Sequence, residues 1–132
     1  MKTWSDQELN ALTEKVIGLC IEIHKTLGPG LLESAYGACL EYELRSSGIR
    51  FAREVVLPVE YKGNKLEVGY RLDFLIEDAL IIELKAVEKL ERLHQAQLLT
   101  YLRLAKKPIG LLINFNVPLL KEGIVRMRNC AA

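Results

Sequence analysis

The sequence predicts a mixed α/β (α+β) fold in which helices flank a central mixed β-sheet. Three observations predict it: two amphipathic helical segments at the start, three β-rich runs from residue 49 onward, and a third helical segment followed by the apolar run "IGLLINF". The order ααβββαβ, with a short further strand expected near residues 125–128, places helices on the faces of one sheet. The chain has no internal repeat, low-complexity tract or linker, so residues 1–132 are expected to form a single domain.

Two helices account for the N-terminal segments. The first follows "SDQE" at residues 5–8, a capping-box signature, and its apolar residues recur at helical spacing as far as Leu27. Gly28 and Pro29 end it, because glycine suits the left-handed position after a helix and proline cannot continue one. The second helix is expected from about Leu31 to Ser47. Its apolar stripe is predicted to contain Leu32, Tyr36, Leu40 and Leu44.

The middle of the chain reads as an antiparallel meander. Its three runs are "FAREVVLPVEYKG", "KLEVGYRLDFLIED" and "ALIIELKAVE", separated by Gly63-Asn64 and Glu77-Asp78. The third run is apolar on both faces and should be a central strand, as should "IGLLINF". One face of the second run is predicted to carry Val68, Tyr70, Leu72, Phe74 and Ile76. The intervening helix, from about Leu90 to Lys106, is predicted to place Leu90, Leu93, Gln97, Tyr101 and Leu104 on one stripe.

Composition limits the classes of function. Of the 132 residues, 50% are hydrophobic and 27% charged, as in globular proteins. No apolar run approaches the roughly 18 residues of a membrane span, and "MKTWSDQELN" is too polar for a secretory signal, so a cytoplasmic protein without membrane contact is expected. A formal net charge of +1 does not indicate a strongly basic nucleic-acid-binding face. The three cysteines show no zinc spacing and are expected to be reduced thiols.

One carboxylate interrupts the apolar stripe of the second helix. Glu33 lies among residues that otherwise favour a core, with Gly37 one turn later. A carboxylate in the first turn can stabilise the helix dipole, but that role does not require the inward face. Glu33 is therefore a candidate functional residue.

Charged residues also occur on the predicted central strand. Glu83 and Lys85 share one of its faces, where charges are costly unless they are paired or lie in a cleft. A three-residue turn after the preceding strand would place Asp73 opposite Glu83, whereas a two-residue turn would pair it with Ile82. A structural ion pair of Lys85 with either carboxylate explains these residues equally well. Gln97 and Tyr101, taken alone, read as core polar residues.

A metal centre is the alternative to an ion pair. Asp73, Glu83 and the Leu84 carbonyl would supply the hard oxygen ligands that suit Mg²⁺ or Mn²⁺. Such a centre hydrolyses phosphodiesters by polarising a phosphoryl oxygen and activating water. Lys85 could orient or deprotonate that water or neutralise charge, and Glu33 could add a carboxylate directly or through water.

The order of these residues resembles a known superfamily. The set Glu33, Asp73, Glu83-x-Lys85 and Gln97-x-x-x-Tyr101 is similar to that of the PD-(D/E)XK nucleases. "GLLESAY" at residues 30–36 matches the motif GxxExxY, and with "HKTLGPGLLESAY", "YRLDFLIEDALIIELKAVEKL", "HQAQLLTYL" and "GLLINFN" it resembles the GxxExxY family, a branch of that superfamily. The resemblance covers about residues 13–129. Leu72 replaces the proline of the superfamily name and leaves the acid in place.

The resemblance implies a restriction-endonuclease-like αβββαβ core with an extra N-terminal helix, and Mg²⁺- or Mn²⁺-dependent cleavage of nucleic acid, most of all DNA, leaving a 5′-phosphate. By position it implies metal ligands at Asp73, Glu83, Leu84 and Glu33, a base or charge stabiliser at Lys85, and accessory residues at Gln97 and Tyr101. Members often dimerise, so a homodimer is one expected assembly. The alternative is a catalytically silent module that binds nucleic acid or a protein partner. Its salt-dependent contacts would come from Arg50, Arg53, Lys106, Lys107, Arg126 and Arg128.

Overall fold

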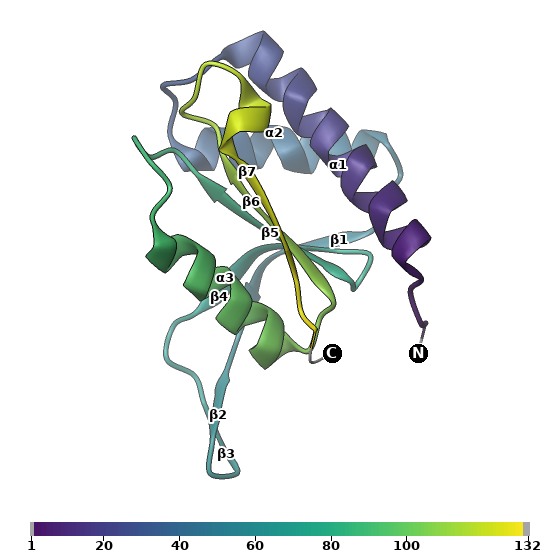
Figure 1. Cartoon of the computed structure of the whole chain (residues 1–132), viewed down its shortest axis with the longest axis vertical. Helices are drawn as coiled ribbons and strands as arrows, with labels where there is room; N and C mark the ends of the chain where they lie inside the picture. The colour runs from purple at the N-terminus through teal and green to yellow at the C-terminus, as the bar shows by residue number, and fades with distance from the viewer. Residues whose placement is uncertain (1, 131–132) are drawn as a thin grey trace.

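A five-stranded mixed sheet forms the centre of the protein in a computed structural model that describes residues 2–130 (Figure 1). The ends of the predicted domain, residues 1 and 131–132, lie outside the described part. The helices are α1 (Asp6–Leu27), α2 (Glu33–Ser46), α3 (Arg92–Ala105) and the short 3₁₀ helix η1 (Leu120–Gly123). The strands are β1 (Phe51–Val56), β2 (Val59–Tyr61), β3 (Asn64–Leu66), β4 (Arg71–Ile76), β5 (Leu80–Lys85), β6 (Ile109–Asn114) and β7 (Ile124–Arg128).

The sheet order is β1-β4-β5-β6-β7, with β5 and β6 parallel and the other neighbours antiparallel. The parallel pair is joined through α3, as a parallel connection requires a crossover. The predicted fold class is therefore confirmed, and α2, β1, β4, β5, α3 and β6 form the predicted αβββαβ core. Helix α1 is the extra N-terminal helix, and β7 is the short last strand.

Helices cover both faces of the sheet (Figure 1). α1 and α2 bury one core, which includes Val16, Leu40, Ile82 and Ile113. α3 covers a second core on the opposite face, which includes Ile81, Leu98, Leu102 and Leu112. All six residues of β6 are buried, as its unbroken apolar sequence predicts for a strand between two helical layers. No helix within residues 2–130 is both long enough and apolar enough to cross a membrane.

The turn between α1 and α2 is fixed by a tyrosine. Gly28 ends α1 with φ 68°, a left-handed conformation that favours glycine. The hydroxyl of Tyr36 donates to the Gly28 carbonyl at 2.6 Å and accepts from the Leu31 N–H at 3.2 Å. The Tyr36 ring also stacks on Phe115, with the ring centroids 4.2 Å apart. These contacts hold the start of α2 against the end of the sheet.

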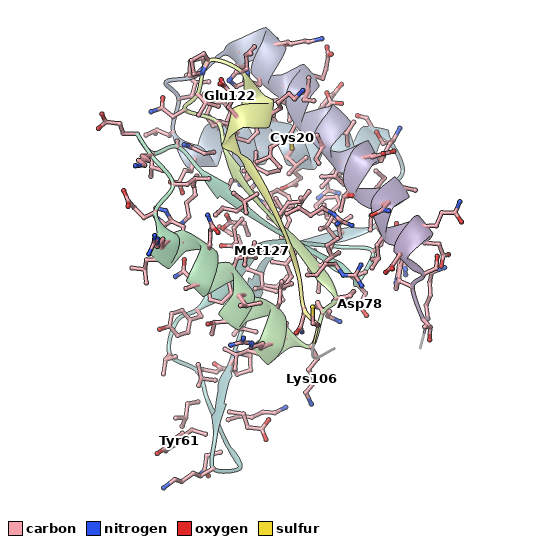
Figure 2. All side chains as sticks on the ribbon, viewed as in Figure 1. Cys20, Tyr61, Asp78, Lys106, Glu122 and Met127 are labelled. Atoms are coloured by element: carbon pink, nitrogen blue, oxygen red, sulfur yellow. The ribbon has the colours of Figure 1, made fainter. Side chains whose placement is uncertain are left out.

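The first two β-rich runs divide differently from the prediction. Each gives two strands rather than one, and β2 and β3 pair only with each other in a hairpin that projects from the body of the protein (Figure 1). The breaks fall near Pro58, which has no N–H to donate to a ladder, and at Gly69, whose φ is 90°. Tyr61 points away from the body of the protein (Figure 2), and Val68 and Tyr70 are exposed rather than on the buried face of β4.

The predicted side-chain alternation of β4 is also interrupted. Phe74 and Ile76 belong to the core under α1 and α2, but Leu72 packs in the core under α3. The interruption falls at Asp73, between the pairs Arg53–Phe74 and Val55–Leu72. Glu54, which takes the position opposite Asp73 in this register, has a left-handed φ of 56°. The strand therefore rotates at the residue where the candidate site begins.

Two predicted apolar stripes are wrong at their first turn. Leu32 is 76% exposed and Leu93 is 77% exposed. The packed faces begin about one turn later, at Tyr36 in α2 and at Leu98 in α3. Helical periodicity describes which side chains share a face, but it cannot tell how much of a helix lies over the sheet.

Candidate active site

The turn between β4 and β5 sets the register of the two candidate acids. Ile76 pairs with Leu80 across a three-residue turn, whose first two residues are left-handed with φ 52° and 54°. Extending this register along both strands places Asp73 opposite Glu83. This is the register that the sequence required if these residues were to form one site.

Carboxylates replace the backbone ladder at this position. The pairing of β4 with β5 ends at Phe74 and Ile82. Beyond it, the Asp73 N–H donates to Glu83 Oε2 at 2.8 Å, and the Leu84 N–H donates to Asp73 Oδ2 at 2.7 Å. Such charge-assisted bonds are among the stronger ones in proteins. The two carboxylates are therefore held side by side between the strands, and each bond uses only one of the two oxygens.

A backbone carbonyl faces the same gap. In an extended strand the N–H and C=O of one residue point to the same side. Because the Leu84 N–H faces Asp73, the Leu84 carbonyl faces the carboxylate pair as well. The next carbonyl, that of Lys85, points the other way and accepts from the Phe115 N–H at 2.9 Å. Two carboxylates and one carbonyl thus converge between β4 and β5.

The pair is electrostatically costly without a cation. Burial and the neighbouring charge of Asp73 raise the pKa of Glu83, which is only 7% exposed, to about 8. Burial also raises the pKa of Asp73, although the hydrogen bond from the Leu84 N–H opposes that shift. The positive charge of Lys85 lowers the pKa of both carboxylic acids. At neutral pH the cation-free pair therefore tends to keep a proton.

These donors fit a divalent cation held by two carboxylates. Mg²⁺ in proteins is commonly bound by one or two carboxylates and keeps several waters, so the three oxygen donors form a sufficient set. Within residues 2–130, however, no three His, Cys, Asp or Glu side chains gather closely enough to hold a metal ion together. A direct three-carboxylate set with Glu33 is thus absent from this part of the chain.

Glu33 lies at the edge of the site rather than in a buried stripe. It is the first residue of α2 and is exposed, because the first turn of the helix extends past the packed face. Its Oε2 accepts from the Ala86 N–H at 3.3 Å, one residue beyond Lys85. It also lines a cleft of about 310 Å³ together with Asp73 and Leu84. Glu33 is directed toward the sheet, as its place on the apolar stripe predicts, but its side chain is exposed.

The remaining predicted residues are placed unequally. Lys85 is half-buried and follows Glu83 on the same face of β5. Tyr101 is a buried residue of α3. Its burial and, to a smaller extent, the charge of Glu83 raise the pKa of its hydroxyl, so Tyr101 lies within electrostatic range of the carboxylate pair. Gln97, one turn earlier on α3, is half-buried and takes no part in the hydrogen bonds of the two carboxylates.

Two further residues lie near the site: Asn114, to which the sequence assigned no role, and Arg53, which it named only as one of six basic residues that could contact nucleic acid. The Asn114 side chain donates to the Val87 carbonyl at 2.9 Å and accepts from the Val87 N–H at 3.0 Å, which fixes the chain just after Lys85. The one available signal was a polar residue at the end of the otherwise apolar "IGLLIN". Arg53, on β1, lines the same cleft as Asp73 and Glu33. No periodicity distinguished it from the other basic residues.

The protein thus has a mixed sheet whose strands β4 and β5 separate around two acidic side chains, with helices on both faces. The sequence matches the family model described as the PD-(D/E)XK nuclease superfamily over residues 10–127. The match spans most of the chain, so the protein belongs to this superfamily and its fold is restriction-endonuclease-like. No protein with a curated description matches the sequence. Nucleases of this superfamily generally use divalent metals.

Proposed function

We propose that this protein is a metal-dependent nuclease that hydrolyses phosphodiester bonds of nucleic acid, with DNA as its substrate. The observation that carries the proposal is the buried pair of Asp73 and Glu83, with the pKa of Glu83 raised to about 8. A site that holds two carboxylates together at this cost is suited to a bound cation, which would displace the shared proton. Similarity of "GLLESAY" to the GxxExxY motif supports placing the protein in that branch of the superfamily.

The ion-pair explanation of these charges has less support. Among the ion pairs of residues 2–130, none joins Lys85 to Asp73 or Glu83 within 4.0 Å. Instead, backbone N–H groups hold both carboxylates in place. An arrangement that fixes two acids beside each other, and leaves one oxygen of each outside these bonds, favours ligation over charge pairing.

We assign a role to each side chain on this basis. Asp73, Glu83 and the Leu84 carbonyl would hold Mg²⁺ or Mn²⁺. A divalent cation supplies Lewis-acid activation of the phosphate and of the attacking water when it is bound. Lys85 stabilises negative charge on the phosphate, since its charge already lowers the pKa of both neighbouring acids. Glu33 accepts hydrogen bonds at the edge of the cleft and would orient a water molecule there.

Tyr101 and Gln97 have supporting roles in the proposal. Tyr101, which is buried on α3 and whose pKa is raised by burial and by the charge of Glu83, would limit the contact of the carboxylate pair with solvent and so strengthen electrostatic interactions inside the site. Gln97 would contact the phosphate or Lys85 when substrate is bound. We also propose that the chain acts as one domain and that two copies associate, because one small domain offers little surface with which to hold a duplex. Sedimentation velocity tests this association: a monomer at assay concentrations would contradict it.

Cleavage by purified protein tests the proposed function. Duplex, single-stranded and branched DNA, and RNA, are incubated with Mg²⁺ or Mn²⁺ and compared with EDTA controls. We expect metal-dependent cleavage that Glu83→Gln reduces by at least about 100-fold, and that Glu60→Gln on the exposed hairpin leaves unchanged. Failure of the wild-type protein to cut any of these substrates overturns the proposal, and tight binding without cleavage would favour the silent binding module.

A further inference from the structure

Arg53 is the one basic side chain among the described residues that line the cleft beside the carboxylate pair. The cleft also contains the acids Glu33, Glu54 and Asp73. An unpaired arginine would be attracted to any of them, yet its ion pair is made with Glu41 of α2, outside this cleft lining. The proposed nuclease reaction does not by itself require a positively charged side chain at this position.

Two contacts fix the guanidinium of Arg53. Its Nη1 donates to Glu41 Oε1 at 3.0 Å, and its central carbon lies 5.4 Å from the centroid of the Phe74 ring, in cation–π range. Glu41 also accepts from Arg45 at 3.0 Å, so the two arginines share one carboxylate and the group keeps one net positive charge. The shared hydrogen bonds lower the pKa of Glu41, which keeps that carboxylate charged.

The helix leaves room for this side chain. A Cβ atom on Gly37 would lie 2.5 Å from Arg53 Nη2, closer than a Cβ atom in a protein approaches another atom, so the guanidinium would have to shift. Gly37 is in the middle of α2, where glycine destabilises a helix by about 1 kcal/mol relative to alanine. The absence of a side chain at Gly37 therefore accommodates the guanidinium at a cost to the helix.

The backbone beside Arg53 is strained as well. Glu54 has φ 56°, which a residue with a side chain seldom adopts, and it lies opposite Asp73. Strain of this kind occurs preferentially at functional sites. Arg53 thus lines the cleft between Glu54, whose backbone is left-handed, and Gly37, whose missing side chain leaves room for the guanidinium.

We propose that Arg53 binds a backbone phosphate of the nucleic acid, next to the bond that is cleaved. This inference rests on the proposed function, because the nucleic acid that Arg53 would bind is the substrate of that proposal. A guanidinium has five N–H donors in a planar fork that matches phosphate oxygens, and Glu41 uses one of them. The half-buried position, with 29% of the side chain exposed, leaves the group accessible from the cleft.

The competing explanation is that Arg53 only joins α2 to the sheet through Glu41 and Phe74. The two explanations differ in the effect of Glu41→Gln. Glu41→Gln removes the ion pair that joins α2 to Arg53, although the amide oxygen can still accept one hydrogen bond, and leaves the guanidinium charged, so phosphate binding should persist. If Arg53 is only a bridge, Arg53→Gln and Glu41→Gln should have the same effect.

Equilibrium binding of a short fluorescein-labelled DNA duplex in EDTA, where cleavage is blocked, provides the test. Arg53→Gln should weaken binding by about 10- to 100-fold, as expected for a lost charged hydrogen bond, and Arg53→Lys should restore part of it. Arg103→Gln is the matched control, because Arg103 is exposed on α3, on the other side of the sheet from α2 and the cleft. It should change binding by about threefold or less. Gly37→Ala should weaken binding while the melting temperature stays level or rises.

The outcomes separate this inference from the proposed function. Binding that depends on Arg53 in a protein that cuts nothing would support the phosphate site and overturn the nuclease. Metal-dependent cleavage with an unchanged KM in Arg53→Gln would overturn the phosphate site and leave the nuclease. Equal losses of binding in Arg53→Gln and Glu41→Gln would also overturn it, and so would equal losses in Arg53→Gln and Arg103→Gln.

Discussion

Replacing Glu83 with glutamine should stabilise the cation-free protein at pH 8, although it removes a proposed metal ligand. Burial and Asp73 raise the pKa of Glu83 from 4.5 to about 8. A carboxylic acid whose pKa is higher in the folded chain binds its proton more tightly there, so the folded state loses stability as the pH rises from about 4.5 to about 8. Glutamine carries no such charge, and the variant should lack this pH dependence.

The structure sets the size of the effect. At about 1.4 kcal/mol per pKa unit, the shift of Glu83 corresponds to at most roughly 5 kcal/mol. Relaxation around a buried charge reduces this amount, because proteins respond with an effective dielectric constant near 20. The glutamine side-chain oxygen can still accept from the Asp73 N–H, which Glu83 now bonds at 2.8 Å. We therefore expect a gain of about 1–3 kcal/mol at pH 8 and little difference at pH 5.

Urea unfolding of the wild-type protein, Glu83→Gln and the surface control Glu60→Gln at both pH values measures this difference. With Mg²⁺ the order should reverse, because the cation stabilises the wild-type protein by binding the folded state alone. A lower stability of Glu83→Gln than of the wild type at pH 8 in EDTA would refute the reasoning. It would mean that Glu83 is a stabilising partner of Lys85 rather than half of a costly acid pair.

Substitutions at three further residues test the assigned roles. Lys85→Arg keeps the charge and should reduce cleavage by about tenfold, whereas Lys85→Met should reduce it by at least about 100-fold; equal losses would indicate a base instead. Tyr36→Phe removes the 2.6 Å hydrogen bond to the Gly28 carbonyl and should lower the unfolding free energy by about 1–2 kcal/mol in urea. Asn114→Ala removes both bonds to Val87, so stability and kcat should fall together, and an unchanged kcat would contradict its positioning role.

Local sequence patterns determined most of the fold. The capping box before α1, the glycine at residue 28 and the apolar run of β6 each act within a few residues, so periodicity and turn chemistry identified them. The projecting hairpin was missed although its signals were present. Pro58 and Gly69 break the β-rich runs, but the high β-propensity on either side favoured continuous strands.

Only part of the candidate site could be predicted from the sequence. Asp73 and Glu83 could be named from the sequence, but their pairing depended on the length of one turn, which two left-handed non-glycine residues set. The exposure of Glu33 depends on how far α2 extends past the sheet, and the position of Arg53 depends on Gly37 of a different element. These are tertiary relations that no local pattern encodes.

The position of a bound cation is the most direct test of the proposed site. Crystals soaked with Mn²⁺ should show an anomalous peak between Asp73 and Glu83, with both carboxylates and the Leu84 carbonyl at about 2.0–2.4 Å. Glu33 should reach the ion through water, in keeping with its bond to the Ala86 N–H. Soaks that show Mn²⁺ bound at other positions of the protein but no peak at the pair would contradict the metal site and with it the proposed nuclease.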